Sequence, residues 1–190
     1  MDINRLIGAL TREEKVALVS GADQWHTVAI PRLGIPAIMV SDGPHGLRKQ
    51  AAEGDHLGIG VSVPATCFPP ATTSANSWDP SLLFAMGEAI GREAIQEGVS
   101  VVLGPGINIK RTPLCGRNFE YFSEDPYLTG ELATAWIEGI QSMGIGASTL
   151  LPTIKNVGAC SMTPLLMTGH FGRFTWQVSK RLSPRVSHGL

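Results

Sequence analysis

The chain has 190 residues, enough for one domain or for part of a larger one. Hydrophobic residues make up 43% and charged residues 16%, which excludes a disordered or fibrous protein. The formal net charge of −1 gives no indication of a nucleic-acid partner. No apolar run approaches the ~18 residues of a transmembrane helix, and the N-terminus MDINRLIGALTREEK lacks the apolar core of a signal peptide. The sequence therefore predicts a cytoplasmic protein without a membrane partner.

Three segments carry the signals with which helices begin. Thr11 and Glu14 form a capping box before the run KVALVS, which predicts a short helix. The Asp-Pro dipeptides at 79–80 and 125–126 each place a capping carboxylate before a proline at the first helical position. Apolar residues then recur at helical spacing, and Gly98 ends the first of these two runs.

Three segments are predicted as strands, and they alternate with the two longer helices. They are residues 36–40 (PAIMV), 99–104 (VSVVLG) and the start of a third strand at 144–147 (GIGA). The nearly continuous apolar run of the second is typical of a strand covered on both faces of a parallel sheet. This alternation predicts an α/β fold, either a (β/α) barrel or a doubly wound sheet. A complete barrel needs roughly 250 residues, so this chain could hold only part of one.

Two loops follow predicted strands, where ligands bind in both architectures. The first, SDGPHGLR (41–48), carries Asp42, and the second (104–131) carries Arg117 among several acids. Asp42 before Gly-Pro is also typical of a turn former, and Arg117 could simply bridge a neighbouring acid. Together, carboxylates and guanidinium groups on one loop face favour a ligand rich in hydroxyl groups.

Three longer motifs are more specific than either loop alone. They are SDGPHGLR, then FPPATTSANSWDPSLLFAMGEAIGREA (68–94), then LGPGINIKRTPLCGRNFEYFSEDPYLTGELA (103–133). In this order and spacing they resemble the N-terminal domain of glycoside hydrolase family 3, in particular its β-glucosidases. The resemblance runs from near residue 8 to residue 147.

The resemblance implies that residues 1–147 are the N-terminal part of a (β/α)8 TIM-type barrel, incomplete at its C-terminal side. It implies a retaining enzyme that hydrolyses terminal β-D-glucosyl residues without a metal or cofactor, using two carboxylates about 5 Å apart. The partner would be a small β-glucoside or oligosaccharide. By the family pattern, Asp42 and Arg117 bind the terminal sugar. A β-xylosidase is left open.

The other functional residues of the family have no counterpart in the printed sequence. The family's Lys-His pair is due just after residue 147, but no Lys-His dipeptide occurs, and no S-D-W motif follows for the nucleophile. The acid/base residue usually comes from a second domain. The resemblance therefore implies a chain with two sugar ligands, no catalytic residue and no turnover.

Residues 148–190 differ in composition from the part before them. They contain five Lys or Arg and no acid, whereas residues 1–147 contain all sixteen acids. When the family segment K-H-F-A-A-N-N-Q-E is written as codons and read one base later, it gives STLLPTIKN, which is residues 148–156. Residues 167–180 likewise back-translate to the family segment D-R-A-L-R-E-I-Y-L-A-S-F-E. These matches predict that residues 148–190 are an out-of-frame, irregular tail.

Two other functions are compatible with parts of the pattern. One is a non-catalytic sugar-binding fragment, which would need a closed, stable fold, and to which two surviving ligands would give little affinity. The other is a doubly wound nucleotide-binding protein, which would need a glycine fingerprint after the first strand that the sequence does not show.

The frame hypothesis predicts the nucleotide sequence across codons 140–190. A one-base shift near codon 148 should restore the family sequence, including Lys-His-Phe, downstream of that point. Sequencing genomic DNA and transcript across this region checks it. If neither shifted frame encodes the family segments, residues 148–190 are a divergent terminus instead.

Overall fold

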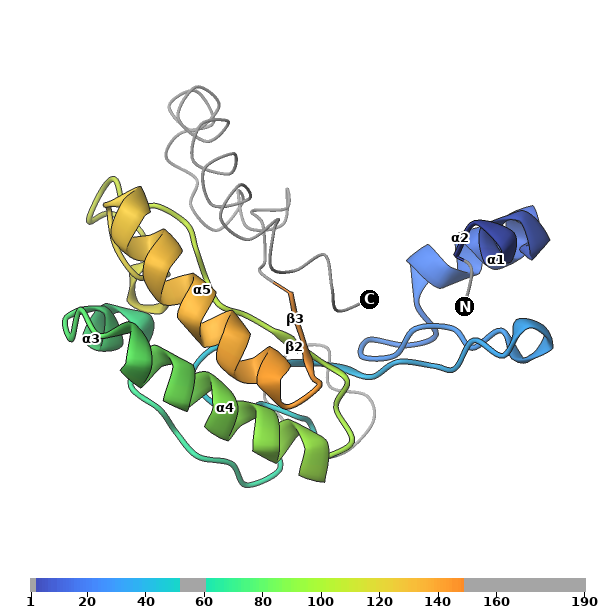
Figure 1. Ribbon diagram of the computed structural model, residues 1–190, viewed down its shortest axis with the longest axis horizontal. Helices are drawn as coiled ribbons and strands as arrows, with labels where there is room; N and C mark the ends of the chain where they lie inside the picture. The colour runs from blue at the N-terminus through green and yellow to red at the C-terminus, as the bar shows by residue number, and fades with distance from the viewer. Residues whose placement is uncertain (1–2, 52–60, 149–190) are drawn as a thin grey trace.

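The computed structural model describes residues 3–51 and 61–148, and a three-stranded parallel sheet lies at its centre (Figure 1). The strands are β1 (Val40–Asp42), β2 (Val101–Leu103) and β3 (Gly146–Ser148), in the order β1-β2-β3. In the register, Val101 lies beside Val40 on one side and Gly146 on the other. The predicted parallel pairing of the first two strands is confirmed, and a third parallel strand follows where it was expected.

The first strand begins later than the sequence predicted. Residues 36–40 were expected to form it, but only Val40 of that segment lies in β1. The preceding residues pair instead with an earlier segment: Thr27 donates its N–H to the Ile38 carbonyl at 3.0 Å, and Ile38 donates to the Thr27 hydroxyl at 2.9 Å. The apolar run therefore pairs with Thr27 at Ile38 and with β2 at Val40. A pattern of hydrophobicity alone does not show where one pairing partner gives way to the other.

Helices α4 (Pro80–Gln96) and α5 (Pro126–Ser142) connect the strands and lie side by side (Figure 1). Both begin where predicted. The Asp79 carboxylate accepts from the Ser81 N–H at 2.8 Å, and the Asp125 carboxylate accepts from the N–H groups of Tyr127 and Leu128. These caps satisfy backbone donors that the first turn of a helix leaves without partners.

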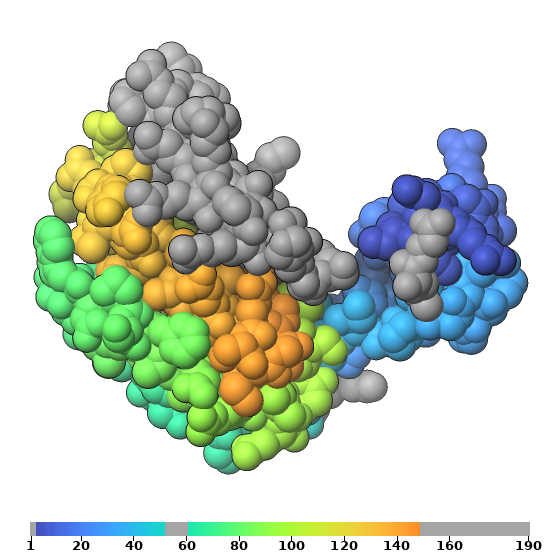
Figure 2. All heavy atoms as spheres, viewed as in Figure 1, coloured from blue at the N-terminus to red at the C-terminus, as the bar shows by residue number. Residues whose placement is uncertain are grey.

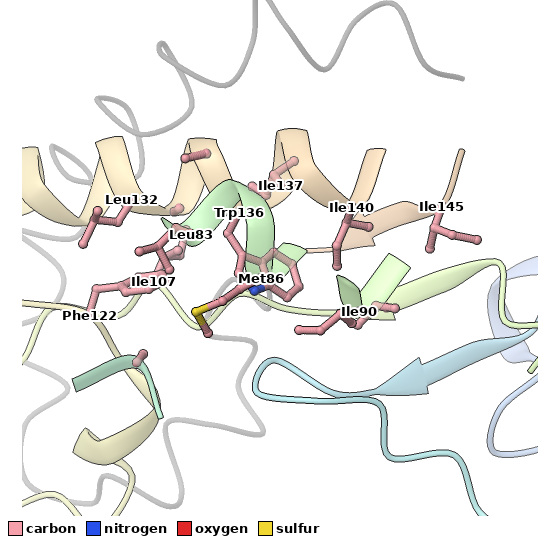
Figure 3. Close-up of a cluster of buried hydrophobic side chains, with 14 of the residues drawn as sticks. Leu83, Met86, Ile90, Ile107, Phe122, Leu132, Trp136, Ile137, Ile140 and Ile145 are labelled. Carbon is pink, nitrogen blue, oxygen red and sulfur yellow. The ribbon is translucent and has the colours of Figure 1, made fainter. Parts of the chain in front are cut away.

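The core lies between these two helices and the sheet (Figure 3). Its largest fully buried side chains include Leu83 and Ile90 of α4, Trp136 and Ile140 of α5, and Val102 of β2. Burying a large apolar side chain contributes ~1.5–3 kcal/mol relative to leaving it exposed. This cluster therefore supplies the main driving force for folding of the described part.

Two glycines let the backbones of α4 and α5 approach each other. A Cβ added at Gly139 would collide with the Phe84 carbonyl oxygen and lie 2.9 Å from the Glu88 nitrogen. A Cβ added at Gly87 would collide with the carbonyl oxygen of Trp136. Any larger residue at Gly87 or Gly139 would force the helices apart and loosen the core beneath them.

The shorter elements surround the two long helices and the sheet. They are α1 (Ile3–Ala9), α2 (Arg12–Ser20), η1 (Pro31–Leu33), α3 (Ala71–Ala75) and η2 (Asn118–Glu120). Of these, α3 adds Ala71 and Ala75 to the core. The predicted capping box of α2 is confirmed, since Thr11 and Glu14 each accept the other's N–H. Neither α1 nor α2 buries a residue, and Figure 2 shows this segment set apart from the main body.

Among the described residues, no helix has both the length and the apolar character needed to cross a bilayer. The predicted irregular tail covers residues 148–190, of which 149–190 lie outside the described residues. Its irregularity stays a prediction.

Gly139→Ala tests the contact between α4 and α5. We expect it to lower the free energy of unfolding by about 1–3 kcal/mol, because the methyl group overpacks a backbone contact. Urea unfolding followed by circular dichroism measures the change. Gly8→Ala in α1 is the matched control: nothing lies within 4 Å of its added Cβ, so it should be neutral or slightly stabilising. Equal effects of the two substitutions would show that the interhelical contact does not limit stability.

Candidate active site

Strand β1 delivers Asp42 to the carboxyl edge of the sheet. The sequence had placed Asp42 in the loop beyond the strand. In the structure it is the last residue of β1. Its carboxylate accepts from the Gly43 N–H at 3.0 Å, and its carbonyl accepts from the Arg48 N–H at 2.8 Å. These bonds fix the backbone on both sides of a half-buried carboxylate.

The turn after Asp42 depends on two glycines. Gly46 has φ 128°, and a Cβ there would collide with the Thr66 carbonyl oxygen. A Cβ at Gly43, with φ 154°, would lie 2.7 Å from the Gly46 carbonyl oxygen. The turn is then fastened to the next loop, where Phe68 donates its N–H to the His45 carbonyl at 2.9 Å. The spacing of glycines in SDGPHGLR thus serves a tight turn that faces a second loop.

Arg117 enters the site from the loop after β2. It precedes the short helix η2, and its Nε donates to the carboxylate of Glu120, three residues later. The Glu120 side chain is only 13% exposed and the Arg117 side chain 34%. The Asn118 amide donates to the Thr112 carbonyl at 2.7 Å, which ties the loop together. The interpretation of Arg117 as a bridge to a neighbouring acid is therefore confirmed.

The two predicted site residues, Asp42 and Arg117, interact through their charges. The pKa of the Arg117 guanidinium is raised, first by its hydrogen bond to Glu120 and further by the charges of Glu120 and Asp42, against the opposing effect of burial. Asp42 and Arg117 thus lie within electrostatic reach of each other, at one end of the sheet. That they bind a sugar stays a prediction.

Two further residues of this cluster were not among the predicted site residues. Burial lowers the pKa of the His45 imidazole, while the charges of Glu120 and Asp42 act in the opposite direction. Its Nε2 is buried and has no hydrogen-bond partner among the described residues. The second residue is Glu120, whose carboxylate accepts from Arg117 Nε. The spacing of Arg117 and Glu120 by three residues was the one signal in the sequence that could have identified this pair.

The cluster suits hydrogen bonding to a neutral polar ligand. Carboxylates accept and a guanidinium donates, which matches the paired donors and acceptors of adjacent hydroxyl groups. Within residues 3–51 and 61–148, no three His, Cys, Asp or Glu side chains come close enough together to hold a metal ion.

His45 predicts a loss of stability on acidification. Because its folded pKa lies below the ordinary value of 6.5, the unfolded chain binds the proton more readily. The stabilising contribution is therefore present above about pH 6.5 and is lost as the pH falls through the folded pKa. Chemical denaturation between pH 7.5 and 5 should show a shallower decline in His45→Gln than in the parent chain. Parallel declines would contradict a buried neutral imidazole at this position.

Comparisons with known proteins agree on one family. The family model described as "Glycosyl hydrolase family 3 N terminal domain" matches residues 4–156. Thermostable beta-glucosidase B of Acetivibrio thermocellus is 58% identical over 147 residues, which is 77% of this chain and 20% of that protein. An exo-alpha-(1->6)-L-arabinopyranosidase of Bifidobacterium longum is 55% identical over 140 residues, covering 73% of this chain and 18% of that protein.

Solved structures show the same relationship. A GH3 beta-glucosidase of Bifidobacterium adolescentis matches with a TM-score of 0.67 and 52% identity over 75% of this chain and 20% of that one. Beta-glucosidase 3B of Thermotoga neapolitana, solved in complex with glucose, matches with a TM-score of 0.69 and 40% identity over 80% of this chain and 23% of that one. The chain thus spans about a fifth of these relatives. The fold is a partial (β/α)8 barrel, of which the described residues form an open parallel sheet.

Proposed function

Because the chain belongs to glycosyl hydrolase family 3, we propose that it supplies the N-terminal part of a β-glucosidase barrel, in which Asp42 and Arg117 bind a terminal sugar. The observation that supports this proposal is that Asp42 ends β1 at the carboxyl edge of the sheet, while its charge helps to raise the pKa of Arg117 in the loop after β2. Their loops, SDGPHGLR and GRNFE, are also the ones whose motifs resemble the family. Ligands of barrel enzymes bind at this edge.

The chemistry of the two side chains fits this role. The Asp42 carboxylate can accept hydrogen bonds from adjacent hydroxyl groups, and the planar Arg117 guanidinium can donate to hydroxyl oxygens. Bonds that involve one charged partner are stronger than neutral ones and are typically worth ~1.5–3 kcal/mol. Together they would fix the orientation of one sugar ring at this edge of the sheet.

The identity of the terminal sugar rests on the named relatives. Several of the matched proteins are called β-glucosidases, and those of Thermotoga neapolitana and Kluyveromyces marxianus were solved with glucose. An arabinopyranosidase is nearly as similar as the β-glucosidase of A. thermocellus, at 55% against 58% identity. Glucose is therefore the proposed ligand, and an arabinopyranose is the matched competitor to test beside it. The comparisons give no support to a nucleotide-binding protein or to a dedicated sugar-binding module.

The second part of the proposal concerns turnover. The retaining mechanism needs a nucleophilic carboxylate and an acid/base carboxylate on the two sides of the glycosidic bond. The printed sequence has no acid after residue 147 and none of the later motifs of the family. We therefore propose that the 190-residue chain binds the sugar without hydrolysing the glycoside.

Both parts are tested on the purified 190-residue chain. Isothermal titration with D-glucose should show weak binding that Asp42→Asn and Arg117→Met each lower by about tenfold or more, since each removes a charged hydrogen-bond partner. Glu88→Gln, which removes an exposed ion pair to Arg92 on α4, should bind as the parent does. Release of p-nitrophenol from its β-D-glucoside should not exceed the rate in buffer.

Two results would contradict the proposal. Hydrolysis by the parent chain that Asp42→Asn abolishes would refute the absence of turnover. Glucose binding that is undetectable, or unaffected by both substitutions, would refute the sugar site.

A further inference from the structure

We propose that Glu93 of α4 is a positioning residue for sugar binding, because it fixes residues 66–68, here called the strap, against the turn that carries Asp42. This inference rests on the proposed function and adds a residue outside the site described above. It starts from contacts that link α4 to the strap and the strap to the turn.

The Glu93 carboxylate accepts from both donors of Thr66. The Thr66 N–H donates to Glu93 Oε1 at 3.1 Å, and the Thr66 hydroxyl donates to the same oxygen. A charged acceptor makes such bonds strong, so they hold the strap at one point on α4. That point is fixed, because the neighbouring Ala94 and, three residues before Glu93, Ile90 are fully buried in the core.

The strap lies directly against the turn. A Cβ added at Gly46 would collide with the Thr66 carbonyl oxygen, so the two backbones are in contact. Two residues further on, the Phe68 N–H donates to the His45 carbonyl at 2.9 Å, and the Phe68 side chain packs against the core. The residue that Glu93 holds is therefore the residue that closes on Gly46.

Asp42 depends on this turn for the direction of its carboxylate. The carboxylate accepts from the Gly43 N–H at 3.0 Å, and the Gly46 N–H donates to the Gly43 carbonyl at 3.4 Å. Glycine backbones are conformationally free, so contacts from outside the turn limit its movement. Without Glu93 the strap would lose its attachment to α4, and the Asp42 carboxylate would be held less firmly.

Helix α4 also holds the chain that leaves the turn. The Lys49 ammonium donates to the Glu97 carbonyl at 2.6 Å and to the Glu97 carboxylate at 3.3 Å. Glu93 and Glu97 are four residues apart and lie on one face of the helix. Lys49 is beyond the turn, whereas Thr66 touches it. The placement of Asp42 is therefore assigned to Glu93.

The first readout is the backbone N–H signal of Gly43 in ¹⁵N NMR of the full chain, since this group donates to the Asp42 carboxylate. Glu93→Ala should shift the signal. Glu93→Gln, which keeps an acceptor oxygen for Thr66, should return it toward the parent position. Glu88→Ala is the matched control: it removes another glutamate of α4, whose partner is the exposed Arg92, and should leave the signal unchanged.

D-Glucose binding by the same chains supplies the second readout. Glu93→Ala should weaken binding by about threefold to tenfold, up to the loss of one charged hydrogen bond. Glu93→Gln should weaken it less, and Glu88→Ala should not change it. In the Asp42→Asn background Glu93→Ala should have little further effect, because substitutions that act through one contact are not additive.

Thr66→Val provides the same test if Glu93→Ala does not fold, since it removes only the hydroxyl donor of an exposed side chain. Equal weakening of glucose binding in the parent and Asp42→Asn backgrounds, or an unchanged Gly43 signal, would overturn the inference. A shifted Gly43 signal without glucose binding in any chain would instead refute the sugar site and support the fixing of the turn by Glu93.

Discussion

The close contact between α4 and α5 is the constraint on which the described structure depends. Gly87 and Gly139 let the two backbones touch, and the side chains beside them fill the space above the sheet. The Trp136 ring of α5 extends from this core to Gly104, near the site. A Cβ at Gly104, just after β2, would lie 3.1 Å from the Trp136 ring and 3.0 Å from Pro44 Cα. Helix α5 therefore supports the turn that follows Asp42.

The site itself is organised by charge within a partly buried space. Two carboxylates, one guanidinium and one neutral imidazole come from the ends of β1 and β2 and from the loops that follow them. The charges of Glu120 and Asp42 act to raise the pKa values of both Arg117 and His45, and limited solvent access strengthens such charge interactions. A sugar suits this space because it brings several hydroxyl groups and no charge.

The chain belongs to glycosyl hydrolase family 3 and spans about a fifth of the relatives it matches. Both facts bear on how the site works. A (β/α)8 barrel gathers its site from the ends of several strands. The described residues include the two side chains proposed to bind the sugar, Asp42 at the end of β1 and Arg117 in the loop that follows β2. Recognition of a sugar by two side chains and cleavage of a glycoside by two others are separable tasks. The proposal that this chain retains only the first follows from that separation.

The sequence by itself predicted the capped helices α2, α4 and α5 and the parallel pairing of the strands. The capping residues Asp79 and Asp125 work within a few residues of the backbone they satisfy, so their effect is visible in a linear pattern. The family motifs likewise predicted Asp42 and Arg117, because each motif is a continuous stretch of sequence. Only the tertiary structure decided where β1 begins, because that depends on pairing with residues near Thr27. It also showed that Arg117 Nε donates to the Glu120 carboxylate, because that contact depends on how the loop after β2 folds around η2.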